Sequence, residues 1–255
     1  MNDMRKTIIT LSALCISVFC SLCGCKGNGE DEKPADTHEY VDLDLPSGTL
    51  WATMNVGAES PEDYGNYYAW GETKAYGEED TSNANNYSYS GNSSYKKTYY
   101  DWSTYKWCSG SSYNTQTKYN TSSSYGTVDN KKVLELADDA AYVKWGENWR
   151  MPTHAEMQEL YNNCTWTWTS LNGKNGYKVS SKKDSSKYIF LPAAGCRTGS
   201  SLIFVGSYGR YWTSSLYESS PSHAWNSHFN SGDDISPDLG CGRYEGLSVR
   251  AVRRQ

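Results

Sequence analysis

The strongest helix signal in the chain lies at residues 145–164, which read WGENWRMPTHAEMQELYNNC. Thr153 and Glu156 have the spacing of a capping box, in which the hydroxyl and the carboxylate each bind a backbone N–H group at the start of a helix. Apolar residues then recur with the period of one helical face: Met157, Leu160, Tyr161 and Cys164. This stretch predicts a helix that begins after Thr153 and packs one side on a hydrophobic core. His154, in its first turn, is expected to be exposed.

A shorter helix is predicted immediately before this one, over residues 133–145. Gly146 follows it, and glycine commonly ends helices because it adopts the left-handed conformation without a steric penalty. Trp145 and Trp149 bracket the tight connection, so the two helices should meet at an aromatic joint. The expected inward residues of the first helix are Leu136, Ala140 and Val143, and its expected outward residues are Asp138 and Asp139.

Short strand patterns surround these helices. Val41, Leu43 and Leu45 alternate with polar residues before a turn at 46–48, which predicts a hairpin whose edge lies beside the C-terminal strand. Helices grouped together, with an antiparallel sheet at the other end, indicate the α+β class. Further short strands are predicted at residues 66–70, 177–179, 188–192, 209–214 and 248–252.

Residues 74–128 differ in composition from the rest of the chain. They are rich in Ser, Tyr, Asn and Gly with almost no aliphatic side chains, which is typical of a long loop-rich insert and not of a second core. The chain has 22 Tyr and 10 Trp against 4 Phe, so its core must use rings that also need polar partners. We expect tyrosines to attach the insert in ordered patches without regular elements, apart from strand fragments at 105–108 and 118–120.

The N-terminus has the pattern of a lipoprotein signal peptide. A short cationic segment precedes an apolar run at residues 8–22, which is too short to predict a membrane span. Gly24 precedes Cys25, and this end of the run resembles the bacterial lipobox, in which the cysteine becomes the lipidated N-terminus. An ordinary secretory signal is the alternative. The predicted organisation is a signal peptide at 1–25, a flexible tether at 26–39 and a single domain at 40–255.

Charge bears on location and on partners. Acidic residues at 30–32 resemble the surface-export signal of lipoproteins from gut Bacteroidetes, so the expected location is the outer membrane, with the domain exposed outside. Without the predicted signal peptide the chain has 22 basic and 28 acidic residues, a net charge of −6. Nucleic acid is therefore not an expected partner, because no basic stripe would neutralise its phosphates.

Six short phrases occur in chain order outside the insert. They are DLPSGTLWA at 44–52, AWGET at 69–73, WRMPT at 149–153, FLPAAG at 190–195, YWTSS at 211–215 and GLSVR at 246–250. Together they resemble the Fibrobacter succinogenes major paralogous domain, a family common in Bacteroidetes lipoproteins, from about residue 40 to the end. The resemblance implies a C-type-lectin-like fold with two helices packed on a small twisted antiparallel sheet. It also implies paired N- and C-terminal strands and a distant similarity to the formylglycine-generating enzyme.

The cysteines of the predicted domain have no metal-ligand spacing. They are Cys108, Cys164, Cys196 and Cys241, without a C-x-x-C motif or close pair, so neither a metal nor a cofactor is predicted. In a secreted chain four cysteines predict two disulfides with three possible connectivities. We expect Cys196 to pair with Cys241 and Cys108 with Cys164. The alternative is an enzyme, either of the formylglycine-generating type, with a reactive copper-binding cysteine pair, or a carbohydrate-active one with paired carboxylates.

Residues 216–245 mix polar and aromatic side chains without periodicity, between two regular phrases. A rigid frame that carries such a mixture is typical of a binding surface. The segment resembles the variable region of lectin-like proteins that retroelements diversify. Trp225 and Phe229 are expected to pack inside. The candidate contact residues are Tyr217, His223, Asn226, His228, Asp233, Asp234 and Asp238.

Two weaker readings of this segment remain open. Its aspartates also fit a calcium site through their oxygens, although a solvated loop is the favoured interpretation. The Glu-Pro-Asn and Gln-Pro-Asp triplets of sugar-binding C-type lectins are absent.

We expect a non-catalytic, lipid-anchored surface adhesin or receptor that binds a protein or a glycan through residues 216–245. A structural loop without a ligand is the alternative for the segment, and a structural protein of the cell envelope is a further alternative for the chain.

Overall fold

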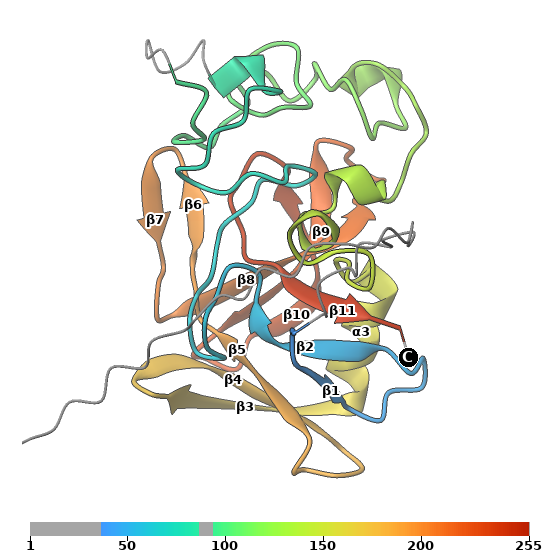
Figure 1. Cartoon of the computed structure of the whole chain (residues 1–255). Helices are drawn as coiled ribbons and strands as arrows, with labels where there is room; N and C mark the ends of the chain where they lie inside the picture. The colour runs from blue at the N-terminus through green and yellow to red at the C-terminus, as the bar shows by residue number, and fades with distance from the viewer. Residues whose placement is uncertain (1–36, 87–93, 255) are drawn as a thin grey trace, which may run out of the picture. The chain divides into compact units, whose positions relative to one another are not determined.

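The computed structural model describes residues 37–86 and 94–254. Residues 36–255 form one compact unit of the α+β class, with few helices and several small antiparallel sheets (Figure 1). Cys25, the predicted signal peptide and most of the predicted tether lie outside the described residues. Among the helices that the structure describes, none is long and apolar enough to cross a membrane.

The two ends of the described chain meet in one three-stranded sheet. β1 (Tyr40–Asp42) and β11 (Arg250–Arg253) both pair antiparallel with the central strand β2 (Leu50–Asn55). Trp51 of β2 lies opposite Val41 on one side and Val252 on the other. The predicted hairpin and its position beside the C-terminal strand are therefore confirmed.

The predicted capping box starts the longer helix, α3 (His154–Asn163). The Thr153 hydroxyl accepts a hydrogen bond from Glu156 N, and the Glu156 carboxylate accepts one from Thr153 N at 2.8 Å. Met157 and Leu160 are buried, as the helical period predicts. The start and the inward face of this helix are therefore confirmed.

The first predicted helix is too long. Leu136–Asp138 form a single 3-10 turn, and α2 (Ala140–Trp145) begins only after Asp139, whose carboxylate accepts from the N–H groups of Ala141 and Tyr142. Gly146 ends α2 with φ of 93°, as expected. The predicted faces are largely wrong: Asp138 and Asp139 are buried, whereas Leu136 and Val143 are about half exposed, and Ala140 alone of the inward set is buried.

Two further sheets and a hairpin complete the unit. The first sheet has the order β3 (Cys164–Leu171), β4 (Lys174–Ser181) and β5 (Tyr188–Pro192). The second has β9 (His223–Asn230) between β8 (Tyr208–Leu216) and β10 (Ile235–Gly242). In the hairpin, β6 (Cys196–Thr198) pairs with β7 (Ser201–Ile203). The predicted strands at 177–179, 188–192 and 209–214 lie in β4, β5 and β8. The predicted strand at 66–70 is reduced to one bridge between Tyr68 and Leu247.

A buried arginine links two of these sheets. Arg250 of β11 is fully buried, and its guanidinium donates to the carbonyls of Ala52 and Phe190 at 3.0 and 2.8 Å and to Asn55 Oδ1 at 3.0 Å. Phe190 belongs to β5. Arg250, the last residue of the GLSVR phrase, therefore joins the β1–β2–β11 sheet to the β3–β4–β5 sheet. Burial lowers the pKa of Arg250 to about 10, which leaves the guanidinium charged at neutral pH.

Tryptophans hold two of the six phrases together in the core. Trp70 of AWGET donates from Nε1 to Thr213 O, and Trp212 of YWTSS donates from Nε1 to Tyr68 O, both at 2.8 Å. Both indoles are completely buried. The expectation that core rings find polar partners is met at these two positions.

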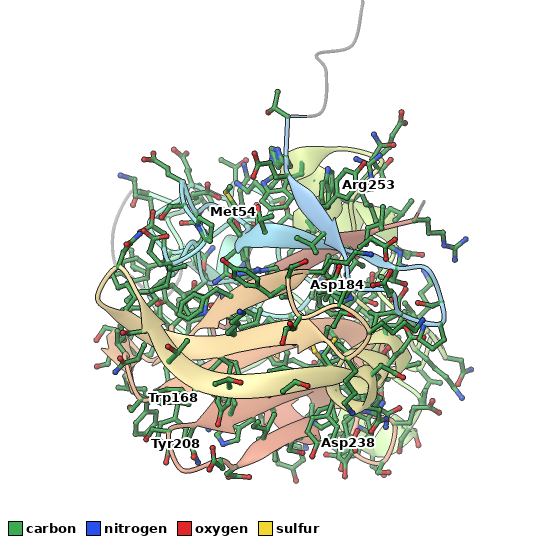
Figure 2. The ribbon with its side chains drawn as sticks, turned by 90° about the horizontal axis from the view of Figure 1, so that it is seen from below. Met54, Trp168, Asp184, Tyr208, Asp238 and Arg253 are labelled. Carbon is green, nitrogen blue, oxygen red and sulfur yellow. The ribbon has the colours of Figure 1, made fainter. Side chains whose placement is uncertain are left out.

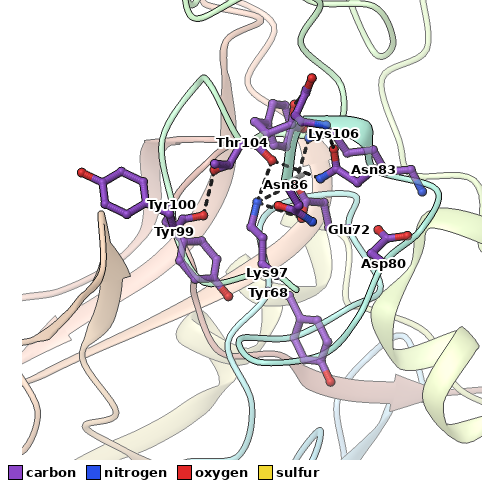
Figure 3. Close-up of polar contacts among 12 residues, drawn as sticks. Tyr68, Glu72, Asp80, Asn83, Asn86, Lys97, Tyr99, Tyr100, Thr104 and Lys106 are labelled. Carbon is purple, nitrogen blue, oxygen red and sulfur yellow. Dashed lines mark hydrogen bonds and ion pairs between the residues drawn. The ribbon is translucent and has the colours of Figure 1, made fainter. Parts of the chain in front are cut away.

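The insert is attached by a buried ion pair (Figure 3). Lys97 Nζ lies 3.0 Å from the Glu72 carboxylate and 3.1 Å from Thr104 O, and the Lys97 and Glu72 side chains are at most 1% exposed. Glu72 also accepts a hydrogen bond from Lys106 N at 2.9 Å. Because Glu72 belongs to the AWGET phrase, these contacts fix both ends of residues 97–106 to the domain.

The described part of the insert is mostly irregular chain, and Figure 1 shows it in teal to light green beside the turn of the β6–β7 hairpin. It contains a 3-10 turn at Ser123–Tyr125 and a helical turn at 84–86, so it is slightly more regular than predicted. The fragment at 105–108 is reduced to a bridge between Cys108 and Gln116, and the described backbone at 118–120 forms no strand. Tyr100, Tyr105 and Cys108 form a small hydrophobic cluster with Ala69.

Candidate ligand-binding pocket

Residues 216–245 are more regular than their sequence suggests. They contain β9, β10 and the turn at 217–223 that leads into β9, where Ser220 N donates to Tyr217 O and His223 N donates to Ser220 O. Helix α3 packs against the β8–β9–β10 sheet. One face of the predicted binding segment is therefore committed to the interior, and its free surface is narrower than predicted.

A pocket of about 360 Å³ lies where this segment meets the insert. Both segments contribute its walls, and we refer to it as the aromatic pocket. Residues from the insert are Trp102, Tyr113 and Tyr125, and residues from the C-terminal segment are Ser220, Ser222, His223, Gly242, Tyr244 and Glu245. The pocket thus joins two parts of the chain that are about 100 residues apart.

The rings of the aromatic pocket form two edge-to-face pairs. Trp102 and Tyr244 have centroids 4.7 Å apart at 68°, and Tyr113 and Tyr125 have centroids 5.9 Å apart at 65°. The first pair crosses from the insert to the C-terminal segment. Tyr113 is 53% exposed, so the second pair presents open ring surface to solvent. Edge-to-face pairs are a favoured aromatic geometry and hold the rings in fixed positions.

Hydroxyl groups fix an imidazole at the side of the pocket. His223 Nδ1 lies 3.1 Å from Ser220 Oγ and 3.0 Å from Ser222 Oγ, and Ser220 Oγ lies 3.3 Å from the Tyr125 hydroxyl. Burial lowers the pKa of His223, so the ring is neutral at neutral pH. A neutral ring that accepts at Nδ1 carries its hydrogen on Nε2. On this assignment Nε2–H is left to donate to a ligand.

The one carboxylate in the described lining has its charge balanced. Glu245 Oε2 lies 3.2 Å from Arg210 Nη1, and both side chains are about one-fifth exposed. Arg210 Nη1 also lies 3.9 Å from Cys241 Sγ. The carboxylate retains oxygen lone pairs for a ligand, since a carboxylate offers about four acceptor positions. The aromatic pocket therefore combines acceptors and donors without a large net charge.

Arg243 supports both walls of the aromatic pocket from inside the molecule. Its side chain is fully buried and makes a cation–π contact with Trp70, 4.9 Å from the ring centroid. Its guanidinium donates to four groups, namely the Tyr105 hydroxyl and Lys118 O at 2.9 Å, Pro221 O at 3.0 Å and Tyr119 O at 3.1 Å. Three of these belong to the insert and one to the turn before β9, so Arg243 ties together the two segments that line the pocket.

A larger hollow of about 450 Å³ is a weaker candidate. It is lined by Leu136, Glu147, Asn148, Trp149, Arg150 and Arg254. The one ring in its described lining, Trp149, is 1% exposed, and Arg150 is already paired with Glu156 at 2.5 Å. This hollow offers no exposed ring to a ligand, whereas the aromatic pocket has one exposed ring, Tyr113, and three partly buried ones.

The predicted contact residues do not form one site. His223 lines the aromatic pocket, and Tyr217 packs beside it, with its ring 6.4 Å from His223 and 4.5 Å from Trp225. Asn226 is completely buried and donates to Leu239 O at 2.8 Å, and His228 is 9% exposed. We therefore no longer expect Asn226 and His228 to contact a ligand. Their positions in the central strand β9 explain the burial.

The three predicted aspartates have separate partners. Asp233 accepts from the Tyr177 hydroxyl at 3.3 Å, and Asp234 lies 3.6 Å from His228. Asp238, in β10, contacts residues of α3. Figure 2 shows Asp238 well separated from Tyr208, whose ring lies 5.3 Å from His228. In residues 37–86 and 94–254, no group of three or more His, Cys, Asp or Glu side chains is placed to hold a metal ion.

His154 is not the exposed residue that the sequence predicts. Its ring stacks on Trp225 with a centroid distance of 4.0 Å and an angle of 7°, and its Nε2 lies 2.6 Å from Asp238 Oδ1. Gln158 also donates to Asp238 at 2.8 Å. These contacts dock α3 on β9 and β10. Phe229 is completely buried and Trp225 is half-buried in these contacts, consistent with the expected packing roles.

The four cysteines of the described chain are buried free thiols, which differs from the two predicted disulfides. Cys108 belongs to the insert cluster and Cys164 to the cluster around Trp51 and Tyr177, so their predicted pairing is wrong. Cys196 and Cys241 share the cluster around Trp70, where both are unpaired. Burial raises the pKa of Cys164 and Cys196 to about 11, so both thiols remain protonated at neutral pH.

Most of the aromatic pocket was not among the predicted residues. The missed residues are Trp102, Tyr113, Tyr125, Ser220, Ser222, Tyr244 and Glu245. The density of tyrosine in the insert was a usable signal for Tyr113 and Tyr125. No local pattern indicates that the insert folds back on residues 220–245, because that contact depends on the buried side chain of Arg243.

Comparison of the chain with models of known protein families gives no match. No curated protein and no solved structure matches it either.

Proposed function

We propose that this chain is a non-catalytic binding protein of the cell surface, lipid-anchored to the outer membrane at Cys25, with its ligand in the aromatic pocket. The observation that carries the proposal is the composition of that pocket. Rings from the insert face hydroxyls, an imidazole and a carboxylate from residues 216–245. A concave site with apolar walls and a few placed polar groups is typical of small-molecule recognition.

The proposal includes a C-type-lectin-like domain of the major paralogous family. Two features of the fold support it. The strands near both termini pair with one central strand, and the two helices follow each other directly in the chain before most of the strands. Two of the six phrases also have a structural role, since Trp70 donates to Thr213 O and Trp212 donates to Tyr68 O. Fold resemblance does not identify a ligand, so the functional proposal depends on the pocket itself.

The absence of catalysis is part of the proposal. Cys196 and Cys241 lie in the interior, and burial raises the pKa of both thiols, whereas a nucleophilic cysteine needs a thiolate. The described lining of the aromatic pocket contains a single carboxylate, Glu245, and glycoside hydrolysis by the usual route needs two. These features favour binding over turnover.

Programmed diversification of residues 216–245 stays a prediction, and the burial of each residue now indicates which positions could vary. Variation would be tolerated at exposed positions such as Glu218 and Asp233, and not at Asn226 or Phe229, which are completely buried. Related copies of the gene whose variable positions fall mainly on buried residues would contradict diversification of a binding surface.

The proposal is tested by ligand capture from intact cells. Cells that display the full chain would be exposed to arrays of glycans and of extracellular proteins. We expect capture that a His223→Ala/Tyr244→Ala double variant abolishes. A matched control is Tyr188→Ala, which removes a 43% exposed tyrosine from β5. Equal capture by the double variant and the control, at equal surface display, would refute the pocket as the binding site.

A further inference from the structure

We infer that the aromatic pocket takes a neutral saccharide, bound as the end of a short oligosaccharide and without a metal ion. This inference rests on the proposed binding function and adds the chemical class of the ligand. A volume of about 360 Å³ lies at the lower end of the range for small-molecule sites, which is about 300–1,000 Å³. The pocket therefore suits one or a few ring-sized groups and not a broad protein surface.

The aromatic walls suit the apolar faces of a sugar ring. A pyranose presents C–H groups on its faces and hydroxyls around its edge, so it is amphipathic in the same way as the pocket. Trp102 and Tyr244 are held at 68° to each other, and Tyr113 and Tyr125 at 65°. Each pair is in direct edge-to-face contact, so its rings fix each other's orientation, and the 53% exposed ring of Tyr113 leaves surface on which a sugar face can lie. Tyr and Trp also lose little conformational entropy when they bind, because each has only two side-chain torsions.

The polar groups suit the hydroxyl edge of the same ring. A sugar hydroxyl both donates and accepts, so it needs a donor and an acceptor side by side. His223 offers a donor at Nε2, Glu245 offers acceptors at its carboxylate, and Ser220 offers a hydroxyl that can do either. All three line the same pocket. This mixture matches vicinal hydroxyls better than it matches a purely apolar or purely ionic group.

The charge balance selects a neutral ligand. An aromatic enclosure with a carboxylate can also hold a cation over its rings. Here Arg210 neutralises Glu245 at 3.2 Å, and His223 is neutral, so little negative charge is left to hold a cation. An anionic ligand would meet the Glu245 carboxylate. Calcium takes six to eight oxygen ligands, and Glu245 is the single carboxylate in the described lining, so binding should not need the metal.

The test measures binding by the full chain in lipid nanodiscs. One array carries neutral saccharides, anionic saccharides with sialic or uronic acids, and ligands with a trimethylammonium group. A second array of equal size carries extracellular proteins. We expect neutral oligosaccharides to bind, with affinity unchanged by EDTA and nearly unchanged between low and physiological salt. Tyr244→Ala should weaken binding at least tenfold, and His223→Ala several-fold, whereas Tyr188→Ala should have no effect. Thermal unfolding of each variant would show that the fold is retained.

A second variant separates the ligand classes. Glu245→Gln keeps the shape of the side chain and removes its charge, so neutral saccharide binding should fall less than tenfold. A trimethylammonium ligand or a protein that binds instead, and is lost with Tyr244→Ala, would overturn the saccharide assignment and leave the proposed function standing. Saccharide binding that is unaffected by both Tyr244→Ala and His223→Ala would overturn the pocket itself. Failure of every neutral saccharide to bind would also overturn the assignment.

Discussion

The Nε of Arg243 donates a hydrogen bond of 2.9 Å to the hydroxyl of Tyr105, and both side chains are completely buried. This bond joins the end of the predicted binding segment to the Tyr-rich insert. The same guanidinium also donates to Pro221 O, in the turn before β9, and to Tyr119 O, in the insert, and these two segments line the aromatic pocket. The candidate site therefore depends on an interaction in the core.

Replacing Arg243 should destabilise the protein and release the insert. Arg243→Met leaves four acceptors, three of them buried, without their donor, and an unsatisfied buried polar group costs about 1–3 kcal/mol. We expect a loss of at least ~3 kcal/mol in the free energy of unfolding. Chemical denaturation measures the loss, and limited proteolysis should cut the insert first. Arg254→Met, at an exposed position, is the control. An unchanged unfolding midpoint for Arg243→Met would contradict this role.

The buried Lys97–Glu72 pair should be costly to break. Glu72→Gln leaves the Lys97 ammonium in the interior without its counter-ion, which typically costs about 3–5 kcal/mol. Glu218→Gln breaks the exposed pair with Lys132, where each side chain is 54% exposed, and should cost within ~1 kcal/mol. Urea denaturation of both variants makes the comparison. Similar losses for the two variants would mean that the insert does not depend on the buried pair.

The stability of the unit should fall in acid through Glu156. Burial opposes its ionisation, but hydrogen bonds from Arg150 and Thr153 outweigh burial and lower the pKa of Glu156 to about 2. An ordinary glutamate in the unfolded chain has a pKa of about 4.3. The unfolded state therefore binds the proton first, so the contribution of Glu156 is present above about pH 4.3 and is lost as the pH falls toward 2.

Glu156→Gln tests that linkage. The variant should be less stable at pH 7, because the paired charge is gone, and its stability should decline less between pH 5 and pH 2.5. Unfolding free energies at several pH values give both slopes, with Glu218→Gln, at a 54% exposed position, as the control. Parallel curves for wild type and Glu156→Gln would show that the acid sensitivity comes from other groups.

The proposed anchor gives a separate prediction. Cys25→Ser should move the protein from the membrane fraction to the soluble fraction and abolish incorporation of a labelled fatty acid. Cys23→Ser, two residues earlier, is the matched control and should leave labelling unchanged. Added protease should digest the wild-type domain on intact cells if it faces outward. Membrane association that survives Cys25→Ser would contradict lipidation at this residue.

The sequence predicts those parts of the fold that local chemistry decides. The Thr153–Glu156 capping box, the Gly146 helix end and the hairpin before Trp51 are all set by residues within a few positions of each other. The first half of the helix predicted at 133–145 fails because Asp139 is used as a cap, with its other oxygen bound to Met151 N at 2.8 Å. That partner lies across the helix joint, so helical periodicity could not reveal it.

The missed strands have a different cause. β3 follows α3 without a break, and Cys164, which continues the helical period, is its first residue. β9 lacks a clear alternation because both of its faces are largely covered: Phe229 packs on Tyr177 and Tyr211 on one face, while His228 and Asn226 are buried on the other. A buried polar residue in a central strand has the same local signature as a polar surface loop.

The site was predicted only in part for the same reason. His223 lies in the segment that the sequence marks as a surface, but the rings opposite it come from Trp102, Tyr113 and Tyr125. Their position depends on long-range contacts of Arg243 and Lys97, which a single sequence does not encode in any short motif.

The central claim is that the insert and the C-terminal segment build the pocket jointly. Its most direct test is the ligand affinity of Tyr125→Ala, measured by titration calorimetry beside Tyr244→Ala and Tyr188→Ala. Tyr125 lines the pocket from the insert and Tyr244 from the C-terminal segment, whereas Tyr188 lies on β5 outside the pocket. We expect Tyr125→Ala and Tyr244→Ala each to weaken binding at least about tenfold, comparable to the loss of a well-packed aromatic contact, while Tyr188→Ala leaves it unchanged. Wild-type affinity in Tyr125→Ala would contradict a pocket built jointly by the two segments.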